Sequence, residues 1–463
     1  MKLFTKSSES NAKLGVAERT AYMMGNVGTA LMNTIVASFV MFYYTDVMLL
    51  NPAIIGSLML VSRFFDGVTD LAMGVIVDRT HSRFGKGRAW VLRACIPYAV
   101  CGILMMSVPT NSSELFQYIY VFITYNLCNT VCLTALYVPY NSMTCTLTSD
   151  PYERGVLGTF VMFGAVIGTM AVQSTVVVAT KALGNDPGAW QKVAVVYALI
   201  GACLHLLCFA MTKERNISDD GTLENTKKSN LKEEIKAVLS NKYWLMAVGA
   251  TFLALTFTNM LGGSGMYFAK GVLGDTDYYA AFANVMAITQ LVGMFFAFIP
   301  MKLFGKRNTL MIGLGLMALG CFIQFLFPTI LTAIIICSAI KGIGGALGGA
   351  VLYGLIADTI DYGEWKTGYC AAGIGMAAMT FVTKVSGGIA GSVIGLLMDV
   401  GKYDATLPSQ PQSAIFVITL CFTIIPMVCA ILAMVILIFY KLDKLYPTIQ
   451  KELAERREKK IME

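Results

Sequence analysis

The sequence predicts an all-α membrane protein with twelve transmembrane helices. Of its 463 residues, 56% are hydrophobic and only 14% are charged, and the mean hydropathy is +0.66. A soluble protein of this length needs more polar surface than this composition supplies. The apolar residues form long runs instead of short alternating segments, and a spanning helix takes about 20 such residues, which excludes a membrane β-barrel.

Twelve apolar segments are long enough to cross a bilayer. Their approximate bounds are 20–46, 52–77, 91–109, 116–145, 154–180, 189–211, 243–270, 277–300, 308–327, 329–357, 368–399 and 413–441. A polar stretch rich in Lys, Glu, Asp and Asn separates the first six from the last six. The predicted domains are an N-terminal six-helix half (1–211), a cytoplasmic central linker (212–242), a C-terminal six-helix half (243–441) and a cytoplasmic tail (442–463).

Basic residues are concentrated on alternate loops. The N-terminus, the loops after the second and eighth spans, the central linker and the tail carry most of the Lys and Arg. Because basic loops stay on the cytoplasmic side, we expect both termini in the cytoplasm of a multi-pass protein of the cell (inner or plasma) membrane. The net charge of +7 then reflects orientation and not nucleic-acid binding.

The two predicted halves share a short loop sequence. Arg-Phe-Gly-Lys-Gly-Arg at 83–88, after the second span, recurs as Leu-Phe-Gly-Lys-Arg at 303–307, after the eighth span. Parallel six-helix repeats are typical of the major facilitator fold, so the repeat favours that architecture. The alternative interpretation is a basic inner loop with no further meaning.

Charged residues lie inside the second apolar segment, at Arg63, Asp66 and Asp70. Each such group at bilayer depth costs about 2.5–3.5 kcal/mol on an insertion scale, so these residues usually pair or mark an ion path. Residues four apart share one face of a helix, which places both carboxylates together with the Thr69 hydroxyl beside them. We interpret the cluster as a cation site, with a purely structural ion-pair network as the alternative.

Three further motifs narrow the assignment. They are Tyr-Tyr-Thr-Asp at 43–46, Tyr-Val-Pro-Tyr-Asn-Ser at 137–142 and Ala-Asp-Thr-Ile-Asp-Tyr-Gly-Glu-Trp-Lys-Thr-Gly at 357–368. Together with the stretch at 62–70, they resemble the glycoside–pentoside–hexuronide:cation symporters of the major facilitator superfamily. The resemblance implies secondary active symport of a sugar or glycoside with a monovalent cation, by alternating access.

The resemblance also implies a cation site. In melibiose-transporting members of the family, two aspartates and an asparagine on helix two and a threonine on helix four hold sodium. Asp66, Asp70 and Thr134 match three of these positions, and Thr69 stands where the asparagine would be. Carboxylates and hydroxyls suit a hard cation, so sodium is expected first. A proton remains the alternative. Threonine is shorter than asparagine, so its oxygen reaches less far into the site, and a proton needs no shell of oxygen ligands.

Two basic residues are expected to couple cation and sugar. Arg63 lies one turn before Asp66, and the resemblance implicates Lys384, which we interpret as the one lysine deep in a C-terminal-half helix. The alternatives are a structural ion-pair network with the aspartates for both residues, and a snorkelling side chain for Lys384.

The sugar site departs from the family. The charged sugar anchors of the melibiose-transporting members fall on Ala30, Tyr137 and Met162. Polar and aromatic side chains at cavity depth are the substitute candidates, with helix-packing hydrogen bonds as the alternative for each. The candidates are Asn26, Asn33, Asn129, Tyr137, Tyr140, Asn141, Tyr353, Thr380 and Lys384.

Acidic residues at the cytoplasmic end of the tenth span are expected to pair with basic residues and form an inner gate, and similar pairs are expected in the first half. The gate candidates are Asp78, Arg79, Arg154, Asp358, Asp361 and Glu364.

The sequence contains no nucleophile–base or metal-ligand pattern that suggests an enzyme. We expect no cofactor, and no metal beyond the transported cation. The expected partners are a sugar or glycoside, a sodium ion or proton and the lipid bilayer, with the chain acting as a monomer. The alternative function is a lipid or lysolipid carrier on the same scaffold.

Overall fold

The computed structural model describes residues 14–80, 82–148, 150–215, 238–367, 372–407 and 409–462. Within these ranges all regular secondary structure is helical, which confirms the predicted all-α class. The α-helices are α2 (Val16–Thr34), α3 (Val40–Phe42), α4 (Pro52–Asp78), α5 (Gly87–Met105), α6 (Glu114–Tyr125), α7 (Leu133–Leu147), α8 (Pro151–Ala182), α9 (Pro187–Met211), α11 (Lys242–Gly271), α12 (Tyr278–Phe296), α13 (Phe298–Leu326), α14 (Leu331–Thr367), α15 (Ala372–Val400), α16 (Gln412–Thr419), α17 (Ile425–Phe439) and α18 (Leu442–Met462). Short π-helical segments, η1 (Ile35–Phe39), η2 (Tyr43–Val47), η3 (Asn126–Cys132) and η4 (Leu420–Ile424), continue α-helices without a break.

Eleven helices in the described ranges are long and apolar enough to cross a membrane. They coincide with all the predicted spans except the second. That segment folds as α4, a 27-residue helix that contains Arg63, Asp66 and Asp70. The chain is therefore a multi-pass membrane protein, and the count of twelve spans stays a prediction.

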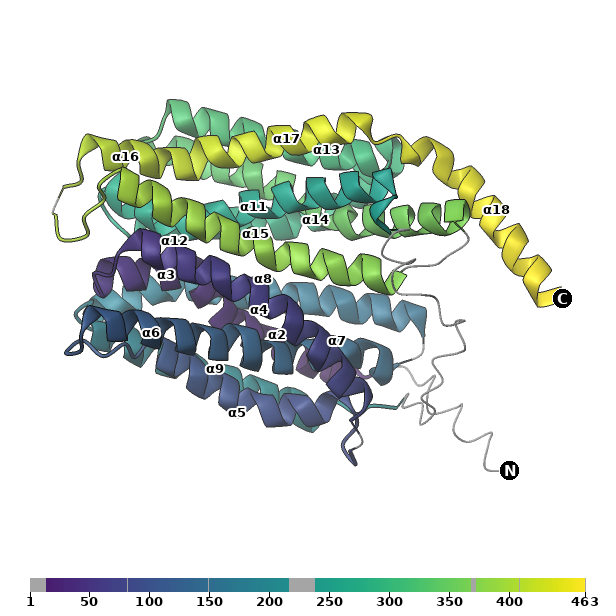
Figure 1. The fold of residues 1–463 in the computed structure, drawn as a ribbon, viewed down its shortest axis with the longest axis horizontal. Coiled ribbons are helices and arrows are strands. Elements are labelled where there is room, and N and C mark those ends of the chain that lie inside the picture. The colour runs from purple at the N-terminus through teal and green to yellow at the C-terminus, as the bar shows by residue number, and fades with distance from the viewer. Residues whose placement is uncertain are drawn as a thin grey trace. The chain divides into compact units, whose positions relative to one another are not determined.

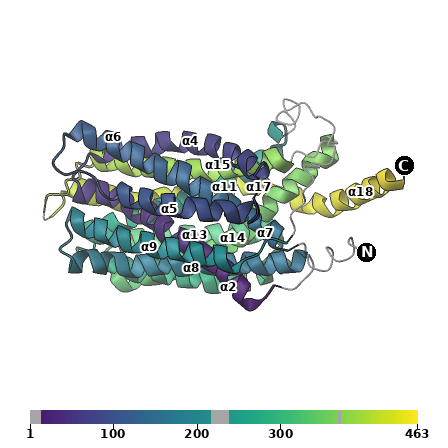
Figure 2. The same ribbon diagram turned by 90° about the horizontal axis from the view of Figure 1, so that it is seen from below.

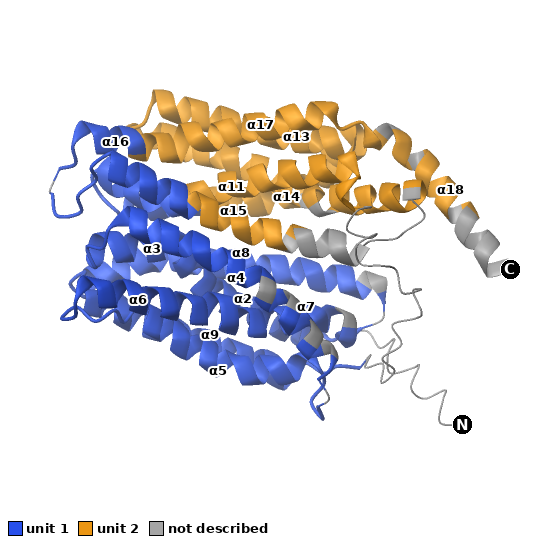
Figure 3. Cartoon of the chain, in the orientation of Figure 1, with its two compact units in different colours: residues 1–221, 263–284, 391–417 blue, residues 222–262, 285–390, 418–463 orange. Residues whose placement is uncertain are grey.

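Contacts divide the chain into two compact units (Figure 3). Unit 1 comprises residues 1–221, 263–284 and 391–417, and unit 2 comprises 222–262, 285–390 and 418–463. The ends of α11 and α15 that contain residues 263–271 and 391–400 thus belong to the first unit. The division into two six-helix halves stays a prediction.

In unit 1, α2 packs along both α8 and α9 (Figures 1 and 2). The close approach depends on glycine. A Cβ at Gly164 of α8 would lie 2.7 Å from the carbonyl oxygen of Met23, and one at Gly168 would lie 2.9 Å from that of Val27. Small residues four apart allow helix backbones to touch in lipid, where packing takes over the role of the hydrophobic effect.

In unit 2, α13 packs against α14 and α17 (Figure 1). Gly313 and Gly344 face each other across the α13–α14 contact. A Cβ on Gly313 would lie 2.6 Å from the Gly344 carbonyl oxygen, and one on Gly344 would lie 2.5 Å from the Gly313 carbonyl oxygen. Side chains larger than hydrogen would force these two helices apart.

The repeated loop sequence adopts a similar backbone at both places. Gly85 has φ of 100° and Gly305 has φ of 80°, in the left-handed region that favours glycine. In each unit a carboxylate from a later segment accepts hydrogen bonds from the backbone that follows this glycine. Glu214 accepts from the backbone nitrogens of Lys86 and Arg88, at 3.0 and 2.7 Å.

The second copy of the loop shows the same arrangement. Asp443 Oδ2 accepts from the backbone nitrogen of Arg307 at 3.0 Å. Arg307 Nε also donates to the carbonyl oxygen of Leu437 at 2.6 Å, as Arg88 Nη2 donates to that of Phe209 at 2.7 Å. The loops therefore resemble each other in structure as well as in sequence, as the parallel-repeat interpretation expects.

Candidate functional site

The acidic cluster lies in the interior of α4. Asn51 caps this helix, since its Oδ1 accepts from the backbone nitrogens of Ala53 and Ile54 at 2.9 and 3.2 Å. The helix then continues to Asp78, so its regular 3.6-residue period places Asp66 and Asp70 one above the other. Asp66 is 1% exposed, whereas Asp70 is half-buried.

Both oxygens of Asp66 have partners. Arg63 Nη1 donates to Oδ2 at 3.0 Å, and Thr130 Oγ1 donates to Oδ1 at 2.5 Å. Arg63 Nη2 also donates to the Tyr125 hydroxyl at 2.7 Å. A buried carboxylate needs such partners, because leaving it unpaired costs several kcal/mol. The Arg63–Asp66 pair is thus part of a hydrogen-bonded group that joins α4 to α6 and η3.

Asp70 has its own hydroxyl partner one helical turn later. Thr134 Oγ1 donates to Asp70 Oδ1 at 2.9 Å. Thr69 is different, because its hydroxyl donates to the carbonyl oxygens of Phe65 and Asp66 on its own helix, at 3.3 and 3.0 Å. The structure therefore brings together Asp66, Asp70 and Thr134 and leaves the Thr69 hydroxyl bonded within α4.

The sequence interpretation missed three residues around Asp66. Thr130 and Asn126 lie in η3, and Tyr125 ends α6 directly before it. The signal for Thr130 was present, because it precedes Thr134 by four residues as Asp66 precedes Asp70. It could be used only once α4 and the η3–α7 helix were known to run in register.

Three predicted sugar-binding side chains make hydrogen bonds to backbone carbonyl oxygens, and two of these bonds join different helices. Asn26 donates to the carbonyl oxygen of Val161 at 2.7 Å, and the Tyr140 hydroxyl donates to that of Tyr22 at 2.6 Å. Asn129 donates to the carbonyl oxygen of Tyr125 at 3.3 Å. All three side chains are buried. The bonds of Asn26 and Tyr140 match the alternative interpretation, a helix-packing hydrogen bond, whereas the bond of Asn129 to Tyr125 stays within the continuous α6–η3 helix.

Other sugar-binding candidates remain accessible. Asn33 on α2 and Tyr137 and Asn141 on α7 are exposed, with Tyr137 at 40%. Lys384 on α15 is half-buried. The side chains of Tyr353 and Thr380 lie outside the described part of the structure, so their predicted roles stay predictions.

The interpretation of Lys384 as the one deep lysine of the C-terminal helices is wrong. Lys341 on α14 is 1% exposed, and its Nζ donates to Gln324 Oε1 of α13 at 2.6 Å. Nζ also lies 4.8 Å from the centre of the Phe422 ring in η4. The sequence places Lys341 inside the apolar segment 329–357, but a lysine at that depth is expected to have an anionic partner.

Some predicted gate residues have defined partners. Lys306 Nζ lies 2.7 Å from both carboxylate oxygens of Asp358, and the Tyr446 hydroxyl donates to Asp361 Oδ2 at 2.7 Å. Arg154 Nε donates to the carbonyl oxygen of Thr148 at 3.0 Å. Among the other gate candidates, Arg79 is exposed and Glu364 is half-buried, and the side chain of Asp78 lies outside the described part of the structure.

The Tyr-Tyr-Thr-Asp motif at 43–46 forms a second polar cluster, in unit 1. Asp46 accepts from Lys270 Nζ at 2.6 Å, from the Tyr403 hydroxyl at 2.5 Å and from Thr45 Oγ1 at 3.0 Å. Thr45 in turn contacts the Tyr267 hydroxyl at 2.6 Å. The motif thus joins η2 to the end of α11 and to the segment after α15.

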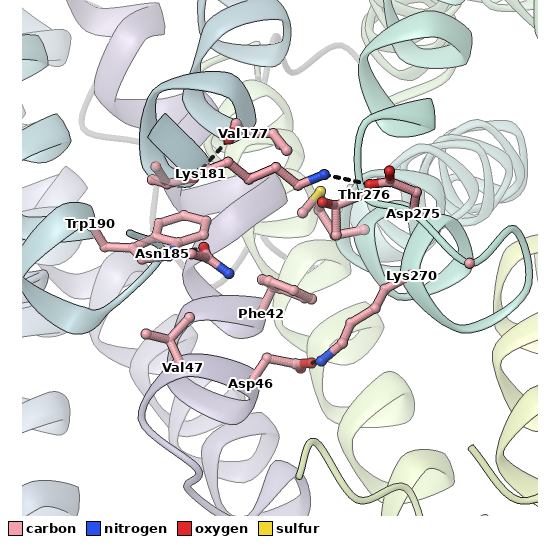
Figure 4. Close-up of a pocket in the computed structure, with 13 residues that line it drawn as sticks. Phe42, Asp46, Val47, Val177, Lys181, Asn185, Trp190, Lys270, Asp275 and Thr276 are labelled. Atoms are coloured by element: carbon pink, nitrogen blue, oxygen red, sulfur yellow. Dashed lines mark hydrogen bonds and ion pairs between the residues drawn. The ribbon is translucent and has the colours of Figure 1, made fainter. Parts of the chain in front are cut away.

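A cavity of about 260 Å³ adjoins this cluster (Figure 4). The Lys270–Asp46 pair lies on one side of it, and Lys181 pairs with Asp275 on the other. Lys181 also lies 2.7 Å from Asp277. The Lys181 ammonium lowers the pKa of the Asp275 carboxyl, which lies between α11 and α12.

A family model described as "MFS/sugar transport protein" matches residues 21–444, almost the whole chain. The chain belongs to this family. Within it, the chain is a member of the glycoside–pentoside–hexuronide:cation symporters, as the motifs at 43–46, 137–142 and 357–368 predicted. This membership makes it a sugar transporter and not an enzyme.

Curated relatives agree over nearly their full length. An isoprimeverose transporter of Lactiplantibacillus pentosus is 31% identical over 95% of this chain and 91% of its own. The putative glycoside/cation symporter YagG of Escherichia coli is 28% identical over 96% of each chain. These descriptions do not favour the alternative of a lipid carrier.

Solved structures support the fold. The xylose transporter XylE of E. coli, in a partially occluded inward-open conformation, matches with a TM-score of 0.62 at 14% identity, over 90% of this chain and 96% of its own. A D-xylose-proton symporter matches with a TM-score of 0.64 at 13% identity, over 92% and 97%. The sugar transporter therefore has the predicted major facilitator fold.

Proposed function

We propose that this sugar transporter imports a glycoside or other sugar together with a monovalent cation, with sodium as the first candidate and a proton as the alternative. The observation that carries the proposal is the pair of carboxylates inside α4, each with a threonine hydroxyl from the neighbouring helix. Such oxygens suit a hard cation, and charges at this depth usually mark an ion path. The description of the YagG relative as a glycoside/cation symporter adds support.

Coupling follows from the electrostatics of this pair. With Arg63 paired to Asp66, the three charged residues in the middle of α4 (Arg63, Asp66 and Asp70) carry a net charge of −1 in a low-dielectric interior, and a bound cation offsets that charge. Closure around the substrate is then more favourable when the cation is present, so cation and sugar raise each other's affinity by the same factor. Transport proceeds by alternating access, with the cytoplasmic side at the termini.

The proposed residue roles follow from this account. Asp66, Asp70 and Thr134 bind the cation, and Arg63 together with Lys384 couples it to the sugar. Asn33, Tyr137 and Asn141 are the first candidates for the sugar because their side chains are exposed. Asp358 and Asp361, held by Lys306 and Tyr446, belong to a cytoplasmic gate.

A substrate screen in proteoliposomes tests the proposal. The panel contains isoprimeverose, pentosides, other glycosides and hexuronates, each offered with an imposed sodium gradient, an imposed pH gradient or neither. We expect at least one sugar to accumulate several-fold above equilibrium with the sodium gradient. Accumulation driven fully by the pH gradient in sodium-free medium establishes the proton alternative. Equilibration without accumulation under every gradient contradicts cation coupling.

A further inference from the structure

The α4 helix and the η3–α7 helix are joined by a regular ladder of hydrogen bonds. Asn126 Nδ2 donates to Ser62 Oγ at 2.9 Å, Thr130 donates to Asp66 at 2.5 Å and Thr134 donates to Asp70 at 2.9 Å. In each pair the two residues are 64 positions apart. The helices therefore run parallel and in register, and each step of four residues along one meets the same step along the other. In the last two of these pairs, a threonine hydroxyl on one helix donates to an aspartate carboxylate on the other.

The two carboxylates are thus equivalent in having one threonine each from the facing helix. Thr69 has no place in the ladder, because its hydroxyl donates to carbonyl oxygens within α4. An ion beside Asp66 finds the Thr130 oxygen next to it, and Thr130 is 3% exposed. At so buried a position water cannot readily replace a missing oxygen ligand.

We infer that Thr130 supplies the hydroxyl ligand beside Asp66 and thereby determines how well the site holds sodium. The inference deepens the proposed function and rests on it. It also assigns the fourth protein group of the site: Asp66, Asp70, Thr130 and Thr134 contribute the oxygens, and the Thr69 hydroxyl does not take the place of the family's amide.

The surroundings of Thr130 let its oxygen face an ion. Its hydroxyl has a second acceptor, since Asn126 Oδ1 lies 3.3 Å away. A hydroxyl rotates freely, so the proton can turn from Asp66 to Asn126 and leave a lone pair for the cation. Arg63 holds the other oxygen of Asp66, which leaves the Oδ1 side for the ion. Binding of sodium on that side requires no rupture of the Arg63–Asp66 pair.

The test uses sodium alone on the purified transporter, so it needs no knowledge of the sugar. The thermal unfolding midpoint is measured in detergent over a range of sodium chloride at constant ionic strength, with choline chloride as the balancing salt. A ligand that binds the folded state raises the midpoint with its concentration. We expect wild type to respond to sodium, and Thr130→Val to need at least tenfold more sodium for half of the response.

Three variants make the result specific. Thr130→Ser keeps the hydroxyl, and we expect it to respond within threefold of wild type. Thr69→Val is expected to shift the response much less than Thr130→Val. Thr124→Val, which removes a buried hydroxyl bonded to the Tyr120 carbonyl in α6, controls for the loss of a threonine and should respond as wild type. If Thr130→Val cannot be purified, Thr130→Ala takes its place in the same comparison.

The outcomes separate the inference from the function on which it rests. A wild-type response that Thr130→Val leaves unchanged, or that Thr69→Val weakens as strongly, overturns the role of Thr130 and leaves sodium binding intact. A wild-type protein that responds to no sodium concentration overturns sodium coupling itself, and the inference with it.

Discussion

Lys270 Nζ lies 2.6 Å from Asp46 Oδ1, and the two side chains differ in burial: the aspartate is 2% exposed and the lysine 33%. Removal of one partner therefore has unequal effects. Lys270→Ala leaves a buried carboxylate without its counter-charge, at a cost of about 3 kcal/mol. Asp46→Asn leaves an ammonium that water can reach, and costs less. Thermal unfolding of the purified protein checks this order, and equal losses would contradict it.

The repeated loops predict a second pair of unequal effects. A Cβ on Gly85 would lie 2.5 Å from Glu214 Cδ, whereas one on Gly305 would lie 3.3 Å from Asp443 Oδ2. Both substitutions by alanine carry the strain of a positive φ, on the order of 1–3 kcal/mol. Gly85→Ala adds a clash with the Glu214 carboxylate, so it should lower the unfolding midpoint further than Gly305→Ala. The reverse order would show that the Glu214 cap gives way easily.

The buried hydrogen bond between Lys341 and Gln324 predicts that removing the lysine and removing the glutamine have different effects on stability. Its ammonium is buried against Gln324 and the Phe422 ring, so Lys341→Met removes a costly buried charge with little change of shape. Because the variant also leaves the buried Gln324 Oε1 without its donor, we expect its stability to be close to that of wild type and greater than that of Gln324→Leu. Gln324→Leu instead removes the oxygen that accepts from Lys341 Nζ, and should destabilise the fold by about 1–3 kcal/mol. The thermal unfolding midpoints of both variants test this order. A lower midpoint for Lys341→Met than for Gln324→Leu would contradict it.

Acid should weaken the pair at the edge of the cavity. Lys181 lowers the pKa of Asp275 below its ordinary value of 3.8. A carboxyl with a depressed folded-state pKa stabilises the fold above its unfolded pKa and loses that contribution as the pH falls through the folded value. Asp275→Asn should therefore lower the unfolding midpoint slightly at neutral pH, and the difference from wild type should vanish in acid below the pKa. Because Asp277 also contacts Lys181, the double Asn variant should show the larger neutral-pH effect.

Much of the fold followed from composition and periodicity. Long apolar runs are dictated by bilayer thickness, and ranges such as 189–211 agree closely with the observed helix Pro187–Met211. The π-helical segment η3 could not be predicted, because a change from i→i+4 to i→i+5 hydrogen bonds over seven residues leaves no mark on the hydropathy pattern. The register between α4 and η3 also depends on packing that one sequence does not encode locally.

The charged part of the candidate site could be predicted from the sequence, because charged residues are costly to place inside a membrane. Asp66 and Asp70 stood out because charges inside an apolar segment need an explanation. Asn26 and Tyr140 gave no such signal, since a buried amide or hydroxyl serves helix packing and sugar binding equally well. Only their partners, Val161 and Tyr22, distinguish the two uses. Thr130 escaped notice because threonine in a membrane helix is ordinary until its neighbour is known.

The most direct measurement of the central claim compares accumulation with exchange in Asp66→Asn and Asp70→Asn proteoliposomes. The substrate is a sugar from the screen, and Asp404→Asn, which alters an exposed carboxylate in the loop between α15 and α16, is the control. Gradient-driven accumulation should fall at least tenfold in both variants, because the cation loses its charged ligand. Sugar exchange at equal concentrations should persist, and Asp404→Asn should accumulate as wild type. Full accumulation in the variant with both Asp66 and Asp70 replaced would contradict the account.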